Sequence, residues 1–331
     1  MAWIPRPFVL YWSNLEKYEN CPQGFLWGRG WGSIDVGGGP GRRKPVPEPS
    51  SRHHAIMGIV IQYAIEKMYN DQLWRDPKGL ADRLVAMGRE EFEKQLLDSR
   101  NFVDWTETSR ADMLRTIEQG ILGYLRTMKA HRLLGPFTRA EHDMVASIHD
   151  PVAGKDWIVG GKADVVFERE ESGVTFLDGK NAQSKGKYTD PDQLRWYSLL
   201  WFLTTGKLPD RLAFVYYRYP HGFLAPGSSV PETGIDWVDF NKADIDSLSE
   251  RALAARRGME AEQFDPTPKP PICRFCDYES VCKARQEQKA ANRRPRKEKV
   301  FTPGGVSLQD ALGDDGFFHF GLGGPDTGSD E

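Results

Sequence analysis

The sequence predicts an α/β fold in which a helix, three strands, a second helix and a further strand follow one another. Apolar residues at helical spacing within 52–70 predict the first helix: Ile61, Ala64, Ile65 and Met68. The pattern then changes to short segments typical of strands, separated by turn residues at Gly154 and at 170–173. The three expected strands are 143–149, 156–168 and 173–178.

The remaining elements follow from the same periodicities. Residues 77–133, rich in Leu, Glu and Arg, predict two or three further helices. A helix is expected over 193–203, and residues 212–217 predict the last strand of the core. A final helix is expected near 240–258, ahead of the last three cysteines.

The composition is typical of a soluble globular protein. The chain has 331 residues, of which 39% are hydrophobic and 27% charged, and its net charge is −3. That charge excludes a protein that is basic throughout, so any nucleic-acid surface has to be a local patch. The first residues lack the features of a signal peptide, and no apolar run is long enough to span a bilayer. We therefore expect a cytoplasmic protein.

Composition and pattern divide the chain into regions with different expected roles. They are an N-terminal segment with the first cysteine (1–30), a Gly/Pro loop (31–51), a helical region (52–135), an α/β core (136–260), a segment with the other cysteines (261–290) and a basic linker with an acidic tail expected to be disordered (291–331).

Two carboxylates and a lysine form the most informative pattern. Asp164 lies inside one expected strand, and Asp178 and Lys180 lie at the end of the next. Residues two apart in a strand share a face, so a hairpin can bring Asp164 close to both. Carboxylates hold a hard divalent cation, which activates water for phosphodiester hydrolysis, and a lysine can stabilise the developing charge.

Asp-x-Lys alone is common and usually marks a solvated strand end. Its context gives it more weight here. Gln193 and Tyr197 lie one turn apart on the following helix, on a face that can point at the same strand ends.

The arrangement G-x-x-D, D-x-K and Q-x-x-x-Y resembles the RecB-like nucleases of the PD-(D/E)XK superfamily, which include AddB-type helicase–nuclease subunits and CRISPR-associated exonucleases. The resemblance implies an αβββαβ core of the restriction-endonuclease type. It implies that Asp164 and Asp178 bind Mg²⁺ or Mn²⁺, that Lys180 is catalytic, and that Gln193 and Tyr197 support the site and contact DNA. The implied activity is a metal-dependent deoxyribonuclease, acting as an exonuclease or on the ends of single strands. A helicase, a recombination protein or a CRISPR-adaptation protein is the implied partner.

The chain departs from the family pattern on the first helix. The family has Gly-x-x-x-His there, with the histidine as a metal ligand, whereas this chain has Gly58 followed by Gln62. Gln62 can donate an oxygen ligand, but it is neutral and weaker. His54 lies on the same face but about 12 Å away along the helix. Asn181 stands where the family often has Ser or Thr, and Glu141 is a further acid for which a surface role is favoured.

The four cysteines fall into one pattern. Cys21 precedes a proline near the N-terminus, and Cys273, Cys276 and Cys282 form C-x₂-C-x₅-C. In a reducing compartment such thiols predict a zinc or iron–sulfur site, and spacing does not separate the two. The family resemblance implies a 4Fe–4S cluster that ties the two ends together, a structural role that closes a very long loop.

Other functions stay open at this stage. The glutamine at position 62 also fits a catalytically weak or inactive DNA-binding or scaffold subunit. A processing factor directed to RNA, or recruited by a partner through the tail at 303–331, is a third possibility. The basic run at 283–299 can contact phosphates or form a solvated face. Trp196, Tyr197 and Trp201 can stack on bases, although a core position is the commoner use.

Overall fold

A computed structural model describes residues 8–29, 51–99, 101–136, 138–169, 173–186, 189–220, 233–274 and 276–292. Contacts group the chain up to Glu287 into one compact unit and the chain from Gln288 into another. The fold below is that of the first unit. The expected Gly/Pro loop lies almost wholly outside the described residues, and so do most of the basic linker and the acidic tail.

A six-stranded mixed sheet forms the centre of the unit. Its strands are β1 (Leu10–Tyr11), β2 (Thr138–Asp150), β3 (Lys155–Arg169), β4 (Gly173–Lys180), β5 (Arg211–Tyr216) and β6 (Ile235–Val238). Strands β2, β3 and β4 pair antiparallel, as two hairpins joined by short turns require. Strand β5 runs parallel to β4, so the chain needs a crossover between them, and a helix provides it. Strand β6 pairs antiparallel with β5, and β1 lies parallel to β3.

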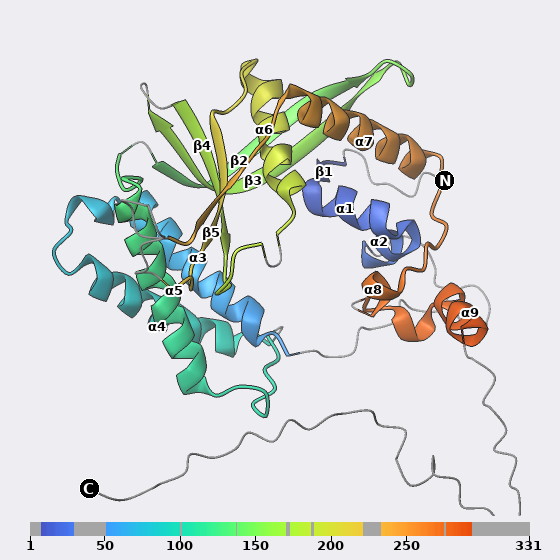
Figure 1. Ribbon diagram of the computed structural model, residues 1–331. Helices are drawn as coiled ribbons and strands as arrows, with labels where there is room; N and C mark the ends of the chain where they lie inside the picture. The colour runs from blue at the N-terminus through green and yellow to red at the C-terminus, as the bar shows by residue number, and fades with distance from the viewer. Residues whose placement is uncertain are drawn as a thin grey trace, which may run out of the picture. The chain divides into compact units, whose positions relative to one another are not determined.

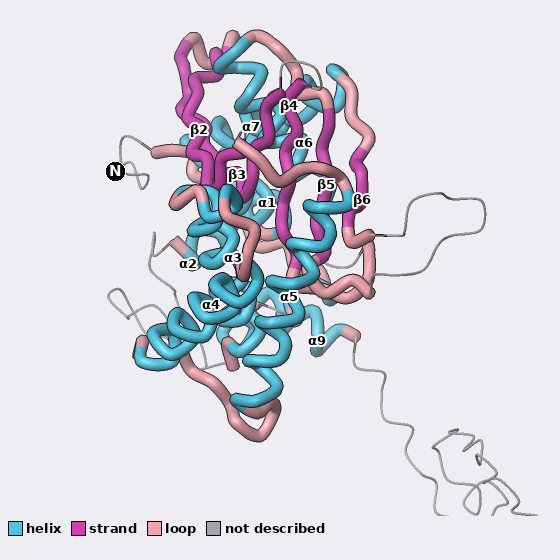
Figure 2. The backbone as a smooth tube through the Cα atoms, turned by 90° about the vertical axis from the view of Figure 1, so that its left-hand side faces the viewer, coloured by secondary structure: helices cyan, strands magenta, loops and turns pink. Residues whose placement is uncertain are grey.

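Helices cover both faces of this sheet (Figures 1 and 2). One face carries α3 (His53–Asn70), α4 (Leu80–Leu97) and α5 (Arg110–Ala130). The other carries α1 (Trp12–Asn20), the crossover helix α6 (Pro191–Thr205) and α7 (Lys242–Glu260). The shorter helices are α2 (Pro22–Gly28), α8 (Pro270–Cys273) and α9 (Lys283–Ala291), with 3₁₀ turns η1 (Leu73–Arg75) and η2 (Glu279–Val281).

The two cores follow from the alternation of side chains along a strand. In β5, Leu212, Phe214 and Tyr216 pack with α6 and α7, whereas Ala213 and Val215 pack with α3 and α5. A strand buried on both faces is largely apolar, which is why residues 212–217 carry no charged side chain.

Local signals fix where the main helices begin. The Ser109 side chain accepts from the backbone of Asp112 and caps α5. The Asp190 side chain caps α6, and the proline that follows it stands at the first helical position. Asn241 forms a capping box at the start of α7. No helix within the described part of the chain is long and apolar enough to cross a membrane.

The predicted order of helix, three strands, helix and strand is confirmed by α3, β2, β3, β4, α6 and β5. The helix expected near 240–258 is α7, and the helical region holds α4 and α5. Strands β1 and β6 were not expected, because each is too short to show a periodicity.

Candidate active site

The fold brings the predicted carboxylates together at neighbouring strands. Val165 of β3 pairs with Leu177 of β4, so the same register places Asp164 opposite Asp178. The backbone amide of Gly179 donates a hydrogen bond of 2.8 Å to Asp164 Oδ2. Asp164 therefore lies against the segment that carries Asp178 and Lys180, as the hairpin expectation required.

Gln193 joins the lysine to the second carboxylate. Lys180 Nζ donates to Gln193 Oε1 at 2.9 Å, and Gln193 Nε2 donates to Asp178 Oδ1 at 2.8 Å. The same amide nitrogen lies 3.2 Å from the hydroxyl of Tyr197, one turn further along α6. The crossover helix thus places its polar face over the end of β4, and all four side chains form one connected group.

One oxygen of this group lacks a hydrogen bond. Asp178 is 2% exposed, and its Oδ2 lies 2.6 Å from Lys180 Nζ, which makes an ion pair. Apart from this ion pair, Oδ2 has no hydrogen-bond partner. A buried carboxylate oxygen without a hydrogen-bond donor is costly, so a divalent cation that competed with the Lys180 ammonium would satisfy this atom.

The electrostatics of the pair favour the protonated forms. Burial raises the pKa of Asp164 well above its ordinary value, and the nearby charge of Asp178 raises it further. Burial also raises the pKa of Asp178, against the opposing effect of Lys180. Two acids held this close are a common arrangement at functional sites, because an added positive charge stabilises both ionised forms.

Gln62, at the position where the resemblance implies a histidine ligand, reaches the site through both ends of its amide. Its Oε1 accepts from the Tyr217 hydroxyl at 2.7 Å, and its Nε2 donates to Glu141 Oε1 at 2.8 Å. Glu141 also forms an ion pair with Lys162. The amide oxygen that could ligate a metal is thus already an acceptor for Tyr217.

Glu141 belongs to the site, which corrects the surface role favoured from sequence. Ala140 pairs with Val165, so the register of β2 and β3 places Glu141 opposite Asp164. Glu141 has a left-handed backbone, with φ of 52°, which is uncommon outside glycine and costs of order 1–3 kcal/mol. The alternation of β2 changes there, since Ala140 and Met144 are four residues apart but pack in opposite cores.

The side chains of Glu141, Asp164 and Asp178 therefore come from one row across three adjacent strands. The sequence contains one signal for the position of Glu141. Counting outward along both strands from the turn at Gly154 pairs positions 141 and 164, but this count needs the hairpin register, which the sequence alone leaves open.

Close packing next to the three carboxylates explains why the residue between Asp178 and Lys180 is a glycine. A Cβ on Gly179 would lie 1.5 Å from the Tyr217 hydroxyl oxygen. Tyr217 is 3% exposed and uses that hydroxyl to orient Gln62. Glycine at 179 is thus required for the tyrosine to reach the first helix.

The other predicted residues lie at varying depth. His54 lies in the first turn of α3 and is largely exposed; partial burial and the charges of His53 and Arg218 lower its pKa. Trp196 is fully buried and Tyr197 is 6% exposed, so both are core residues rather than stacking surfaces. Trp201 packs on the same core, as favoured from sequence.

All four cysteines line one cavity of about 40 Å³. Cys21 caps α2, where its sulfur accepts from the Gly24 amide at 3.4 Å, and the other three lie on and after α8. No cysteine is in a disulfide. Burial and the neighbouring Cys21 and Cys273 raise the pKa of Cys276.

Ordinary contacts also join this segment to the N-terminal helices. Tyr278 donates to the carbonyl of Trp27, 251 residues away, and the two rings meet edge to face. Tyr18 donates to the carbonyl of Gln263 at 2.8 Å. The two ends of the unit are thus packed together by more than the thiols.

Within the described ranges, no three or more His, Cys, Asp or Glu side chains are arranged to hold a metal ion. The carboxylates and the thiols are gathered, but their present side-chain positions do not form a complete coordination shell. This agrees with ion pairs such as Asp178 with Lys180, which occupy oxygens that a cation would compete for.

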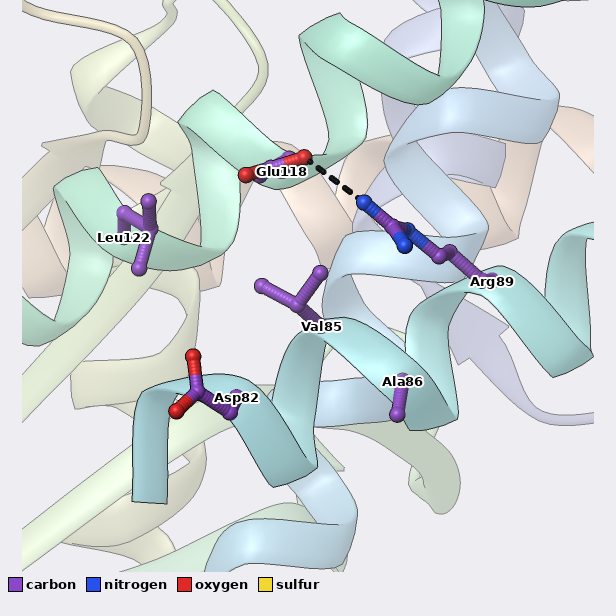
Figure 3. A pocket seen from close by; sticks show the side chains of 6 residues that line it. All are labelled: Asp82, Val85, Ala86, Arg89, Glu118 and Leu122. Atoms are coloured by element: carbon purple, nitrogen blue, oxygen red, sulfur yellow. Dashed lines mark hydrogen bonds and ion pairs between the residues drawn. The ribbon is translucent and has the colours of Figure 1, made fainter. Parts of the chain in front are cut away.

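Two larger grooves are also present. One, of about 500 Å³, lies between α1, α2, α8 and the residues after α8, and it shares Cys21 and Cys276 with the cysteine cavity. Glu16 lines it, and burial and the charge of Asp190 raise the pKa of this carboxyl. The other, of about 390 Å³, lies between α4 and α5 and is bridged by the ion pair of Arg89 and Glu118 (Figure 3). It contains none of the predicted site residues.

Comparison with known proteins gives one family match. The family model described as the PD-(D/E)XK nuclease superfamily matches residues 12–283. No curated protein matches the chain. Among solved structures, the crystal structure of SSO0001 is 15% identical, with a TM-score of 0.32 over 70% of this chain and 97% of that one.

Proposed function

Because the chain belongs to the PD-(D/E)XK nuclease superfamily, we propose that it is a divalent-metal-dependent deoxyribonuclease. We propose further that it degrades or trims the ends of single-stranded DNA. The observation that carries the proposal is the convergence of Asp164, Asp178 and Lys180 with Gln193 at one end of the sheet. This is the set of groups that phosphodiester hydrolysis needs.

The donor set fits Mg²⁺ or Mn²⁺. Asp164 and Asp178 offer carboxylate oxygens, and Asp178 Oδ2 is buried without a hydrogen bond. Mg²⁺ usually takes one or two protein carboxylates and fills its other positions with water and substrate phosphate. Two carboxylates are therefore sufficient before DNA binds. Glu141, opposite Asp164, adds a third acid to the same row.

The roles of the residues follow from their contacts. A bound cation would acidify water and offset the charge of the phosphate. Lys180, held by Gln193 and Asp178, presents an ammonium group that can orient the attacking water or stabilise charge on the phosphate oxygens. Gln193 and Tyr197 act as positioning residues, because Gln193 contacts Lys180 and Asp178 and Tyr197 contacts Gln193.

End-labelled oligonucleotides test the activity. The full chain, purified under anaerobic conditions, is incubated with single-stranded, overhanging and blunt DNA in Mg²⁺, Mn²⁺ or chelator. We expect metal-dependent loss of the strand, reduced by at least about a hundredfold in Lys180→Met and Asp178→Asn. Arg139→Gln, a surface change on β2, is the control for handling and folding. Absence of cleavage of every DNA with either metal would contradict the proposal.

The cysteines are proposed to hold a structural 4Fe–4S cluster. Four thiols around one cavity are the donor set of such clusters and of zinc. The cavity of about 40 Å³ has room for an ion and little else, so binding of a cluster requires the thiols to move outward. Visible absorption and the iron and zinc content of anaerobically purified protein decide between the two. A colourless protein with one zinc per chain contradicts the cluster.

A DNA-binding subunit without catalysis is the second candidate, and Gln62 favours it. Its amide oxygen is engaged by Tyr217, so position 62 of the first helix supplies no free ligand. Mn²⁺ titration followed by electron paramagnetic resonance separates the candidates. Binding that is lost in Asp164→Asn supports the nuclease, and wild-type protein that binds DNA but no Mn²⁺ supports the scaffold.

A further inference from the structure

We propose that Arg218 binds a backbone phosphate of the single strand beside the scissile phosphate, on the side of the site formed by α3. The inference deepens the proposed function and rests on it for the identity of the ligand. Arg218 lies outside the sequence motifs through which the chain resembles its family. The position of Arg218, and a charge that no acidic side chain among the described residues balances, support the inference.

Arg218 is fixed close to the catalytic lysine by the backbone. The amide of Tyr217 donates to the carbonyl of Lys180 at 2.9 Å, and the amide of Arg218 donates to that of Ala182 at 3.3 Å. Its side chain then turns back, and Nη2 donates to the Asn181 carbonyl at 3.1 Å. The guanidinium therefore lies beside the segment that immediately follows Lys180.

The residue before Arg218 joins this part of the chain to the first helix, because the Tyr217 hydroxyl donates to Gln62 Oε1 at 2.7 Å. The charge of Arg218 lowers the pKa of His54, so the arginine and the imidazole are near one another. His54, Gly58 and Gln62 are each four residues apart and share one face of α3. A Cβ added to Gly58 would meet no atom within 4 Å, so the surface between His54 and Gln62 is open. The space at Gly58 is therefore open on the face of α3 that ends at Gln62, which donates to Glu141 of the carboxylate row.

The charge of Arg218 is not balanced within the protein. Nε is buried and has no hydrogen-bond partner, and burial lowers the pKa of the guanidinium. No carboxylate in the described ranges forms an ion pair with it. The other cations at the site are paired, Lys180 with Asp178 and Lys162 with Glu141. A half-buried guanidinium without an acid is unfavourable unless a ligand brings the negative charge.

A phosphodiester satisfies what the arginine lacks. Arginine presents donors in a planar fork that matches two phosphate oxygens, and such charge-assisted bonds are short and strong. Nη2 uses one N–H for the Asn181 carbonyl and Nε is enclosed by the protein, so Nη1 and the second N–H of Nη2 are the donors left for phosphate oxygens. The contact would hold the neighbouring nucleotide while Lys180 and the carboxylates act on the scissile bond, so Arg218 is assigned a substrate-binding role.

The test measures binding of a fluorescent oligothymidylate strand to the full chain, with Ca²⁺ replacing Mg²⁺ to prevent cleavage. Arg218→Gln is expected to weaken binding about tenfold at low salt. It should reduce the slope of log affinity against log salt concentration by about 0.7, the value for one phosphate of a single strand. Arg139→Gln removes the same charge from a surface ion pair and should leave the slope unchanged. Thermal melting checks that both variants are folded.

A second measurement compares positions along the DNA strand within each protein, so it does not require the two proteins to be equally well folded. One phosphate of the strand is replaced by a neutral methylphosphonate, and the replacement is moved along the strand one position at a time. Wild-type protein should lose affinity at the position that Arg218 contacts, and Arg218→Gln should be insensitive there. Equal position profiles for the two proteins, or an unchanged salt slope, overturn the inference even if the protein cleaves DNA. If wild-type protein loses affinity at one position, Arg218→Gln does not, and wild-type protein cleaves no DNA, the inference about Arg218 stands and the proposed nuclease activity is rejected. Wild-type protein that binds no strand rejects both.

Discussion

The replacement Asp164→Asn should make the metal-free protein more stable while removing its activity. Asparagine keeps an oxygen that can accept from the Gly179 amide, so the contact of 2.8 Å survives and the charge is lost. Two carboxylates on facing strand positions, about 5 Å apart at an effective dielectric constant of about 20, repel by roughly 3 kcal/mol. Lys180 offsets part of this repulsion, so we expect a gain of about 2 kcal/mol.

The pH dependence of that gain follows from the direction of the pKa shift. The pKa of Asp164 is raised in the folded protein above its ordinary value of 3.8. Its ionisation therefore disfavours folding, the penalty is absent below pH 3.8, and it grows as the pH rises to the folded pKa. The stability difference between variant and wild type should be full at neutral pH and shrink as the pH falls toward 3.8.

Urea denaturation in chelator, at several pH values, measures the difference. Asp143→Asn, which removes an exposed charge from β2, is the matched control and should change little. Adding Mn²⁺ at about a hundred times its dissociation constant should stabilise the wild type by about 2.7 kcal/mol and leave Asp164→Asn unchanged. An Asp164→Asn protein that is less stable than wild type at neutral pH, or a gap independent of pH, would refute the reasoning.

Two further predictions concern the packing around the site. Tyr217→Phe removes the donor to Gln62 Oε1 and should lower the free energy of unfolding by about 1–2 kcal/mol. Urea denaturation measures this change, and an unchanged free energy would mean that the hydroxyl does not hold Gln62. Gly173→Ala should cost more than Gly154→Ala. Both have positive φ, but a Cβ at 173 would lie 1.8 Å from Asp210 Oδ2, whereas one at 154 meets nothing within 4 Å. Equal melting temperatures for these two variants would show that the overlap is relieved without cost.

The core was predictable because its elements are long and apolar in a regular pattern. Helix α3, strands β2 to β4 and the capped helix α6 each show their period over several turns or pairs. The proximity of Asp164 to Asp178 and Lys180 followed from one hairpin. The position of Glu141 did not, because it depends on an exact register and on a left-handed backbone that breaks the alternation of β2.

Contacts between distant segments were the least predictable part. The partners of Gln62 come from β2 and from the residue after β5, and neither spacing nor periodicity relates them. The role proposed for Arg218 was likewise not predictable, because a single arginine after a strand has no sequence signature. What marks it is the absence of an acidic partner among the described residues, and only coordinates can reveal that.

The packing of Tyr278 on Trp27 has a consequence for how the protein is made. Helices α1 and α2 are synthesised well before the segment after α8 that covers them, since Tyr278 follows Trp27 by 251 residues. The aromatic surface of the early helices therefore stays uncovered until that segment has been made. A chain that ended before Cys273 would hold every strand of the sheet but would leave this aromatic surface exposed.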